Sequence, residues 1–151
     1  MGKVSIVYWS GTGNTEAMAA AMAEGAKDAG AEVELLTVDK AEAAALSEAK
    51  AFALGCPAMG AEELEEGEME PFMAELDSQI AGKTIALFGS YGWGGGEWMR
   101  DWESRVVSDG AAVLSGEGII ADNAPDDDVQ GSGREAGGTG VACYISGGKV
   151  I

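Results

Sequence analysis

The stretch VSIVYWSGTGNT, residues 4–15, decides the fold class of this chain. Its apolar first half predicts a strand, and the alanine-rich amphipathic pattern over 14–29 predicts a helix. The turn between them, 10–15, offers two glycines, three hydroxyl groups and one amide, but no lysine or arginine. Glycine lets the backbone approach a ligand closely, and the N-terminus of a helix attracts anions. The turn therefore predicts a phosphate site made of neutral donors.

Two better-known phosphate motifs do not fit this turn. It lacks the lysine of GxxxxGK[ST], and Glu16 stands where GxGxxG has its last glycine. The alternative to a phosphate site is an ordinary helix start capped by Thr12 or Asn14, and the position of the full turn directly after a strand weighs against it. The residues predicted to hold the phosphate are Ser10, Gly11, Thr12, Gly13, Asn14 and Thr15.

Composition and charge narrow the function classes. At 151 residues, of which 46% are apolar, the chain predicts a single soluble globular domain. It has no histidine and only two cysteines, Cys56 and Cys143, so histidine acid–base catalysis, a zinc site and a disulfide framework are not expected. No apolar run is long enough to span a membrane, and the chain begins without a signal-peptide pattern. The net charge of −17 disfavours nucleic acid and anionic membranes as partners.

Apolar runs that alternate with helical patterns predict an α/β fold, with a parallel sheet covered by helices on both faces. Strands are predicted over 3–9, 32–38, 50–56, 83–89 and 111–121, and helices over 14–29, 41–47, 69–80 and 96–109. The region 131–151 breaks this pattern, because its seven glycines in 21 positions disfavour a helix. We therefore expect one domain over 1–130 and an irregular or disordered tail over 131–151 in place of a last helix.

Two further loops follow predicted strands, at the edge where an open parallel sheet binds its ligands. They are PAMGAE (57–62) and SYGWGGG (90–96). Tyr91 and Trp93, set among glycines, indicate a planar ligand or a partner surface, although a tryptophan folded onto the core is the alternative. A thioether from Met59 against one ring face and an indole against the other would enclose a flat heteroaromatic ring. A phosphate site and a ring site together indicate a mononucleotide.

Three apolar candidates are assigned to the core instead. Trp98 and Trp102 lie four residues apart on a predicted helix, a spacing that places them on one face. Cys56 ends an apolar strand and is expected to be a small buried residue. None of these side chains is expected to contact a ligand.

In its ligand loops the chain resembles the flavodoxins, specifically the short-chain clostridial type. The matching segments are VYWSGTGNTE (7–16), GCPAMG (55–60), EPF (70–72), ALFGSYGWG (86–94) and NAPD (123–126). The resemblance implies a flavodoxin-like three-layer sandwich, with a five-stranded parallel sheet in the order 2-1-3-4-5, and FMN as cofactor. Flavodoxins are themselves a standard example of ligand binding at this sheet edge, so the position of the FMN site at this edge follows from the resemblance.

The resemblance also implies a role in FMN binding for each loop. The first loop matches the one that holds the phosphate, and Met59 and Trp93 match the residues that flank the isoalloxazine ring. Gly60 matches the glycine whose peptide turns over on one-electron reduction, so that its carbonyl accepts a hydrogen bond from flavin N5–H. Glu62 matches the carboxylate that binds the pyrimidine edge of the flavin. The other predicted cofactor contacts are Ala58, Ser90, Tyr91, Gly92, Gly94 and Asn123.

The implied function is that of a low-potential one-electron carrier, which cycles mainly between the neutral semiquinone and the hydroquinone of FMN and is not an enzyme. The acidic field and the FMN phosphate disfavour the anionic hydroquinone, although screening leaves the ring's own contacts as the larger influence. The acidic run 62–70 is either a solvated loop or a docking face for basic surfaces, which 126–128 would extend. The implied partners are oxidoreductases, hydrogenase and flavodoxin reductase in the cytoplasm of an anaerobe, and a monomer is expected.

Two other functions fit the residues less well. An FMN-dependent NAD(P)H quinone or nitro reductase on the same fold would need basic residues beside the flavin, and only Arg100 and Arg105 come near the third loop in the sequence. A receiver-type switch of similar topology would need acidic residues at the end of the first strand, where Trp9 and Ser10 stand. Both are therefore disfavoured.

Overall fold

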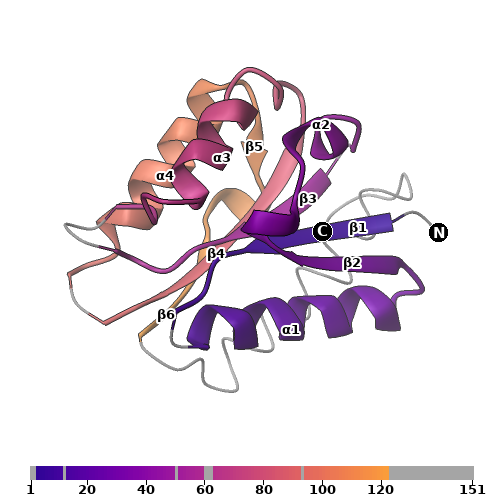
Figure 1. The fold of residues 1–151 in the computed structure, drawn as a ribbon, viewed down its shortest axis with the longest axis horizontal. Coiled ribbons are helices and arrows are strands. Elements are labelled where there is room, and N and C mark those ends of the chain that lie inside the picture. The colour runs from indigo at the N-terminus through magenta and orange to yellow at the C-terminus, as the bar shows by residue number, and fades with distance from the viewer. Residues whose placement is uncertain (1–2, 12, 50, 60–62, 93, 123–151) are drawn as a thin grey trace.

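A parallel sheet lies at the centre of the molecule, with helices on both of its faces (Figure 1). The computed structural model describes residues 3–11, 13–49, 51–59, 63–92 and 94–122. The strands are β1 (Lys3–Tyr8), β2 (Glu32–Thr37), β3 (Ala51–Gly55), β4 (Thr84–Tyr91), β5 (Ala112–Val113) and β6 (Ile119–Asp122). Their order is β2-β1-β3-β4-β5, with β6 also paired to β4, and every pairing is parallel. This is the predicted flavodoxin-like order.

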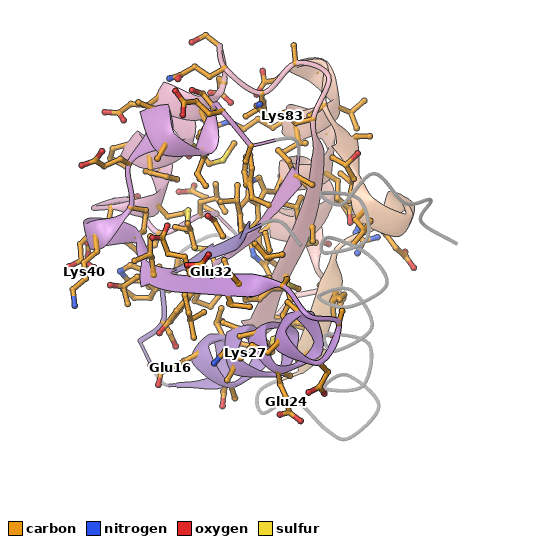
Figure 2. The ribbon with its side chains drawn as sticks, turned by 90° about the vertical axis from the view of Figure 1, so that its right-hand side faces the viewer. Glu16, Glu24, Lys27, Glu32, Lys40 and Lys83 are labelled. Carbon is orange, nitrogen blue, oxygen red and sulfur yellow. The ribbon has the colours of Figure 1, made fainter. Side chains whose placement is uncertain are left out.

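The helices divide between the two faces of the sheet. They are α1 (Asn14–Asp28), α2 (Ala43–Leu46), α3 (Met69–Leu76) and α4 (Glu97–Ser108), with short 3-10 turns η1 (Val38–Lys40) and η2 (Leu114–Gly116). In Figure 1, α1 covers one face, and α3 and α4 lie together on the other. The outer side of α1 is charged: Figure 2 shows Glu16 and Glu24 pointing away from the sheet.

Side-chain alternation along the strands gives each face of the sheet its own core. On the α3 and α4 face the central strands place large residues such as Phe52 and Leu87. On the α1 face they place small ones, among them Ala53 and Ala86, which pack with the alanine-rich side of α1. Successive strand residues point to opposite faces, so both faces of these central strands are buried and their sequences read as nearly continuous apolar runs.

Two of the predicted elements differ from the observed ones. The predicted strand 111–121 is broken into β5 and β6 by η2, in which Gly116 has a φ of 84°. This left-handed conformation favours glycine and does not continue a strand. The predicted helix 69–80 ends at Leu76, with Asp77 as its C-cap. The remaining bounds agree with the prediction to within a few residues.

Within the described ranges, none of the helices combines the length and apolarity that crossing a membrane requires. The predicted tail, 131–151, lies outside the described residues. Its irregular structure, and the division of the chain into a domain and a tail, therefore stay predictions.

Candidate functional site

The turn after β1 is organised by the hydroxyl group of Ser10. Its Oγ accepts hydrogen bonds from the N–H groups of Gly13, at 3.1 Å, and Glu16, at 3.3 Å. The cap position of α1 is Gly13, with a φ of 96° and no side-chain cap, so the predicted alternative of a cap by Asn14 is wrong. Thr12, the other cap candidate, lies outside the described residues.

This arrangement leaves donors at the start of α1. A hydroxyl group has one donor and two acceptor positions, and both acceptor positions of Ser10 are in use, which leaves its own proton for a ligand. The N–H groups of Asn14 and Thr15 have no hydrogen-bond acceptor among the residues that the structure describes. Unpaired N–H groups at a helix N-terminus favour an anion.

A buried hydroxyl pair joins this turn to the end of β4. Thr15 Oγ1 lies 3.2 Å from Ser90 Oγ, and the Ser90 N–H donates to Thr15 Oγ1 at 3.4 Å. The two residues are 1% and 5% exposed. β3 lies between β1 and β4 in the sheet, so the turn after β1 extends across the end of β3. The structure thereby brings together Thr15, a predicted phosphate ligand of the first loop, and Ser90, a predicted cofactor contact of the third.

The second loop extends the backbone pairing of β3 beyond the end of the strand. The Cys56 N–H donates to Phe88 O, and the Ala58 N–H donates to Ser90 O, each at 3.0 Å. Met59 and Glu63 then exchange two backbone hydrogen bonds, at 2.9 and 2.8 Å. This fixes the two residues on either side of 60–62, a segment outside the described residues. Met59 is half-buried at this edge.

Cys56 is the buried small residue that the sequence predicts, and it also contacts the acidic loop. Its thiol donates to Pro57 O and accepts the Glu65 N–H, each at 3.4 Å. Burial raises the pKa of the Cys56 thiol to about 12, so the thiol stays protonated at neutral pH. It therefore serves as a packing and hydrogen-bonding group.

The third loop begins with Tyr91, the last residue of β4. This side chain is half-buried rather than fully exposed, because its ring packs against that of Trp98, with centroids 5.6 Å apart and planes tilted by 46°. Trp98 and Trp102 are each 1% exposed, which confirms their assignment to the core. Gly92 and Gly94 are exposed in the same loop.

The acidic run is not uniform. Glu65 turns back on the chain, where its carboxylate accepts the N–H groups of Gly67, Glu68 and Met69 at 2.6, 2.8 and 3.1 Å. This closes the start of α3, as capping carboxylates do. In the described part of the loop, the exposed carboxylates are those of Glu63, Glu66 and Glu68.

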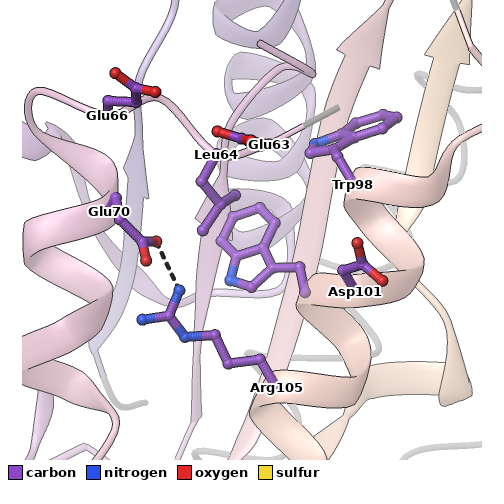
Figure 3. Close-up of a pocket in the computed structure, with 8 residues that line it drawn as sticks. Glu63, Leu64, Glu66, Glu70, Trp98, Asp101 and Arg105 are labelled. Atoms are coloured by element: carbon purple, nitrogen blue, oxygen red, sulfur yellow. Dashed lines mark hydrogen bonds and ion pairs between the residues drawn. The ribbon is translucent and has the colours of Figure 1, made fainter. Parts of the chain in front are cut away.

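A groove of about 380 Å³ lies between this loop, α3 and α4 (Figure 3). Arg105 lies in it and binds carboxylates from α3: Nη1 donates to Glu70 Oε2 at 2.6 Å, and Nη2 donates to Asp77 Oδ2 at 2.8 Å. The hydrogen bonds that Arg105 donates to Asp77, and also those to Glu70, raise the pKa of Arg105 further above its usual range. Arg100 lies within ion-pair distance of Glu103 and Glu117. Both arginines that come near the third loop in the sequence are therefore engaged by carboxylates.

A second carboxyl group lies beside the Arg105 and Asp77 pair. Burial, a hydrogen bond to Asp77 and the charge of Asp77 raise the pKa of Asp109 to about 6. Burial opposes ionisation of Asp77 as well, but hydrogen bonds from Arg105 and Asp109 outweigh it and lower its pKa. Asp109 Oδ2 is buried without a hydrogen-bond partner among the described residues.

The described part of the predicted site gathers at one edge of the sheet. It comprises Ser10, Gly11, Gly13, Asn14, Thr15, Ala58, Met59, Ser90, Tyr91, Gly92 and Gly94. The other predicted cofactor contacts, Thr12, Gly60, Glu62, Trp93 and Asn123, lie outside the described residues. The described residues hold no group of three or more His, Cys, Asp or Glu that would bind a metal ion.

Known proteins of similar sequence identify the family of this chain. The family model described as flavodoxin matches residues 6–136. The chain belongs to the flavodoxin family. Its members bind FMN and carry electrons at low potential, and they are electron-transfer proteins rather than enzymes.

Individual flavodoxins match over most of the chain. The flavodoxin of Megasphaera elsdenii is 48% identical over 126 residues, which are 82% of this chain and 91% of that protein. The flavodoxin of Clostridium beijerinckii is 47% identical over 127 residues, 84% of this chain and 91% of that one. The solution structure of two-electron reduced M. elsdenii flavodoxin has a TM-score of 0.80 and 45% identity, and covers 89% of this chain and 98% of its own. These matches confirm the short-chain resemblance and the fold.

Proposed function

We propose that this flavodoxin holds FMN at the edge formed by the loops after β1, β3 and β4, with the phosphate on the Ser10 turn and the ring beside Met59 and Tyr91. One observation carries the proposal: the Thr15 and Ser90 hydroxyls meet in a buried pair beside N–H groups at the start of α1 that have no acceptor among the described residues. Bound FMN supplies one-electron redox chemistry, and the residues of the chain bind it, orient it and exclude water.

The donors present suit a phosphate group. The Ser10 hydroxyl accepts the N–H groups of Gly13 and Glu16 at the start of α1, where the positive end of the helix dipole favours an anion. Gly11 and Gly13 are exposed, and the position of an added Cβ on Gly13 meets nothing within 4 Å, so the backbone there is open to a ligand. Without a lysine or arginine in the turn, binding depends on hydrogen bonds more than on opposite charge.

The ring end of the site rests on two described side chains. Met59, which follows the paired segment 56–58, is half-buried, and the ring of Tyr91 packs against that of Trp98. The roles predicted for Gly60, Glu62, Trp93 and Asn123 stay predictions. With so many carboxylates near this edge, added negative charge on the ring is disfavoured, which supports a low potential for the second electron.

The redox partners of this flavodoxin are proposed to dock through basic faces. The exposed carboxylates of Glu63, Glu66 and Glu68 follow directly after the ring loop, and the whole chain has a net charge of −17. Complementary charge speeds encounter and sets orientation more than it adds affinity. Oxidoreductases, hydrogenase and flavodoxin reductase stay the predicted partners, and the cytoplasm of an anaerobe stays the predicted location.

A reductive titration of the FMN-loaded protein, followed by its absorption spectrum, tests the proposal. The expected result is two separate one-electron steps. The variant Ser10→Ala removes the hydroxyl that orders the turn, so FMN should bind at least about tenfold more weakly, as expected for a lost hydrogen bond to a charged group. A single two-electron step, or unchanged FMN affinity in this variant, would contradict the proposed site.

Partner docking has a separate test. Neutralising Glu63, Glu66 and Glu68 together should slow electron transfer to a basic partner protein at low salt and remove most of its salt dependence, because exposed charges are screened within about 8 Å at physiological salt. Equal rates and salt slopes for the wild type and the triple variant would contradict this docking face.

A further inference from the structure

Two tryptophans of α4 differ in what their indole N–H groups contact. Trp98 Nε1 donates to the backbone carbonyl of Cys56 at 3.0 Å, in a buried position. Trp102 Nε1 is also buried, but it has no hydrogen-bond partner among the residues described. Both side chains are 1% exposed and lie one turn apart on the same helix. Core packing alone therefore does not account for the contact that Trp98 makes.

The carbonyl that Trp98 contacts lies in a tightly packed position. A Cβ atom added to Gly89 of β4 would lie 2.1 Å from Cys56 O and 3.1 Å from Trp98 Cζ2. Glycine is needed there because the Cys56 carbonyl and the indole ring occupy the space of a side chain. The carbonyl is thus enclosed between the backbone of β4 and the Trp98 ring.

This carbonyl stands at the start of the second loop. Three residues later, Met59 pairs with Glu63, and between them Ala58 donates to Ser90 O. The same indole ring supports Tyr91 in the third loop. Trp98 therefore connects α4 to both loops that the proposed function places beside the flavin ring.

We infer that Trp98 is a positioning residue of the FMN site, which orients the second loop by holding the Cys56 carbonyl with its indole N–H. The inference rests on the proposed function, since it assumes that the second and third loops contact the ring. It assigns to Trp98 a role that Trp102 does not share.

The expected effect is on preorganisation. A loop already held in its binding conformation loses less entropy when the cofactor binds, so its affinity is higher. Without the indole N–H, the buried Cys56 carbonyl loses its partner, and the segment 56–59 would sample conformations that do not bind the ring. The same change alters the relative affinity of the loop for the oxidised and the reduced cofactor, and a midpoint potential measures this difference.

The experiment compares Trp98→Phe with the matched control Trp102→Phe. Both remove an indole and keep an aromatic ring at buried positions on one face of α4, but among the described residues the first alone removes a hydrogen bond. Three quantities are measured: FMN affinity, the two one-electron midpoint potentials, and amide hydrogen exchange at Ala58 in the FMN-free protein. Tm values of both FMN-free variants report the general cost to packing.

For Trp98→Phe we expect about fivefold weaker FMN binding and about tenfold faster amide exchange at Ala58, since one net hydrogen bond changes an equilibrium by about five- to tenfold. The separation of the two midpoint potentials should become smaller. Trp102→Phe should change Tm but leave all three quantities near the wild-type values. If Trp98→Phe does not fold, Trp98→3-benzothienylalanine replaces the N–H by sulfur and keeps the ring shape, with the same expectations.

Equal effects of the two variants on affinity, potentials and exchange would overturn the inference and leave the proposed FMN site standing. Weak or absent FMN binding by the wild-type protein would instead overturn the proposed site, and the inference with it. The exchange measurement does not require bound FMN, so it separates the two failures.

Discussion

Replacing Thr15 by valine tests the buried hydroxyl pair between the first and third loops. Valine keeps the shape of threonine and removes Oγ1, which lies 3.2 Å from Ser90 Oγ and accepts the Ser90 N–H at 3.4 Å. The Ser90 hydroxyl can rotate toward another acceptor, but its backbone N–H cannot. With the site at 1% and 5% exposure, water does not readily replace the lost partner.

The free energy of unfolding of the FMN-free protein should fall by about 1–2 kcal/mol, the cost of one buried donor without a partner. For a domain of this size that lowers Tm by about 3–6 °C. Ser90→Ala should cost less, about 0.5–1 kcal/mol, because Thr15 Oγ1 keeps the backbone N–H as a donor. The double variant should cost less than the sum of the single ones, with a coupling of about 1 kcal/mol.

The same variants report on the cofactor. If both hydroxyls bind the phosphate, each single variant loses a hydrogen bond to a charged group, worth about 1.5–3 kcal/mol, so FMN affinity should fall at least about tenfold. Fluorescence titration of the FMN-free variants measures this, and thermal unfolding measures stability. Ser47→Ala is the control, because its hydroxyl donates to Ala44 O in the exposed α2 region. Additive stability effects, or unchanged FMN affinity in both variants, would refute the reasoning.

Three further predictions concern stability. The raised pKa of Asp109, about 6 in the folded protein, contributes stability that is present below about pH 4 and is lost as pH rises through 6. In the wild type the free energy of unfolding should therefore fall between about pH 4 and 7, and Asp109→Asn should make this fall smaller and the protein more stable at pH 7. Urea unfolding at several pH values measures this. An added Cβ on Gly55 would lie 2.1 Å from the Phe88 ring, so Gly55→Ala should cost at least about 2 kcal/mol by urea unfolding, and a loss under 0.5 kcal/mol would contradict the packing. Glu65→Ala removes the acceptor of three backbone N–H groups, so it should lower the free energy of unfolding by about 1–2 kcal/mol and speed amide exchange at the start of α3. Unchanged amide exchange there would show that this helix start does not need the Glu65 carboxylate.

Local patterns predicted the strands and indicated a ligand edge, whereas the order of the strands came from the resemblance to flavodoxins. Runs such as those of β3 and β4 are apolar on both faces, which is typical of central parallel strands. The glycine and hydroxyl pattern of 10–15 indicated an anion site without any knowledge of what lies opposite. Spacing on α4 was enough to place Trp98 and Trp102 in the core.

Contacts between distant segments were beyond such patterns. Thr15 was predicted as a phosphate ligand, but its partner Ser90 is 75 residues away and became visible only in the folded chain. The spacing on α4 predicts only a core role for Trp98, because the N–H contact with Cys56 depends on how α4 approaches the end of β3. The break between β5 and β6 was missed as well, although Gly116 within the predicted strand was a signal for it.

The two edge strands of the sheet affect how readily the protein aggregates in concentrated solution. In the described part of the chain, one margin of the sheet is formed by β5 and β6, two short strands separated by η2, which offer no long ladder of backbone groups for a neighbouring chain to extend. The other is formed by β2, which carries the carboxylates of Glu32 and Glu34 (Figure 2 labels Glu32). Short, interrupted or charged outer strands resist strand addition by a second molecule. The described part of the sheet therefore offers little template for fibril growth, so we expect the protein to stay dispersed in concentrated solution.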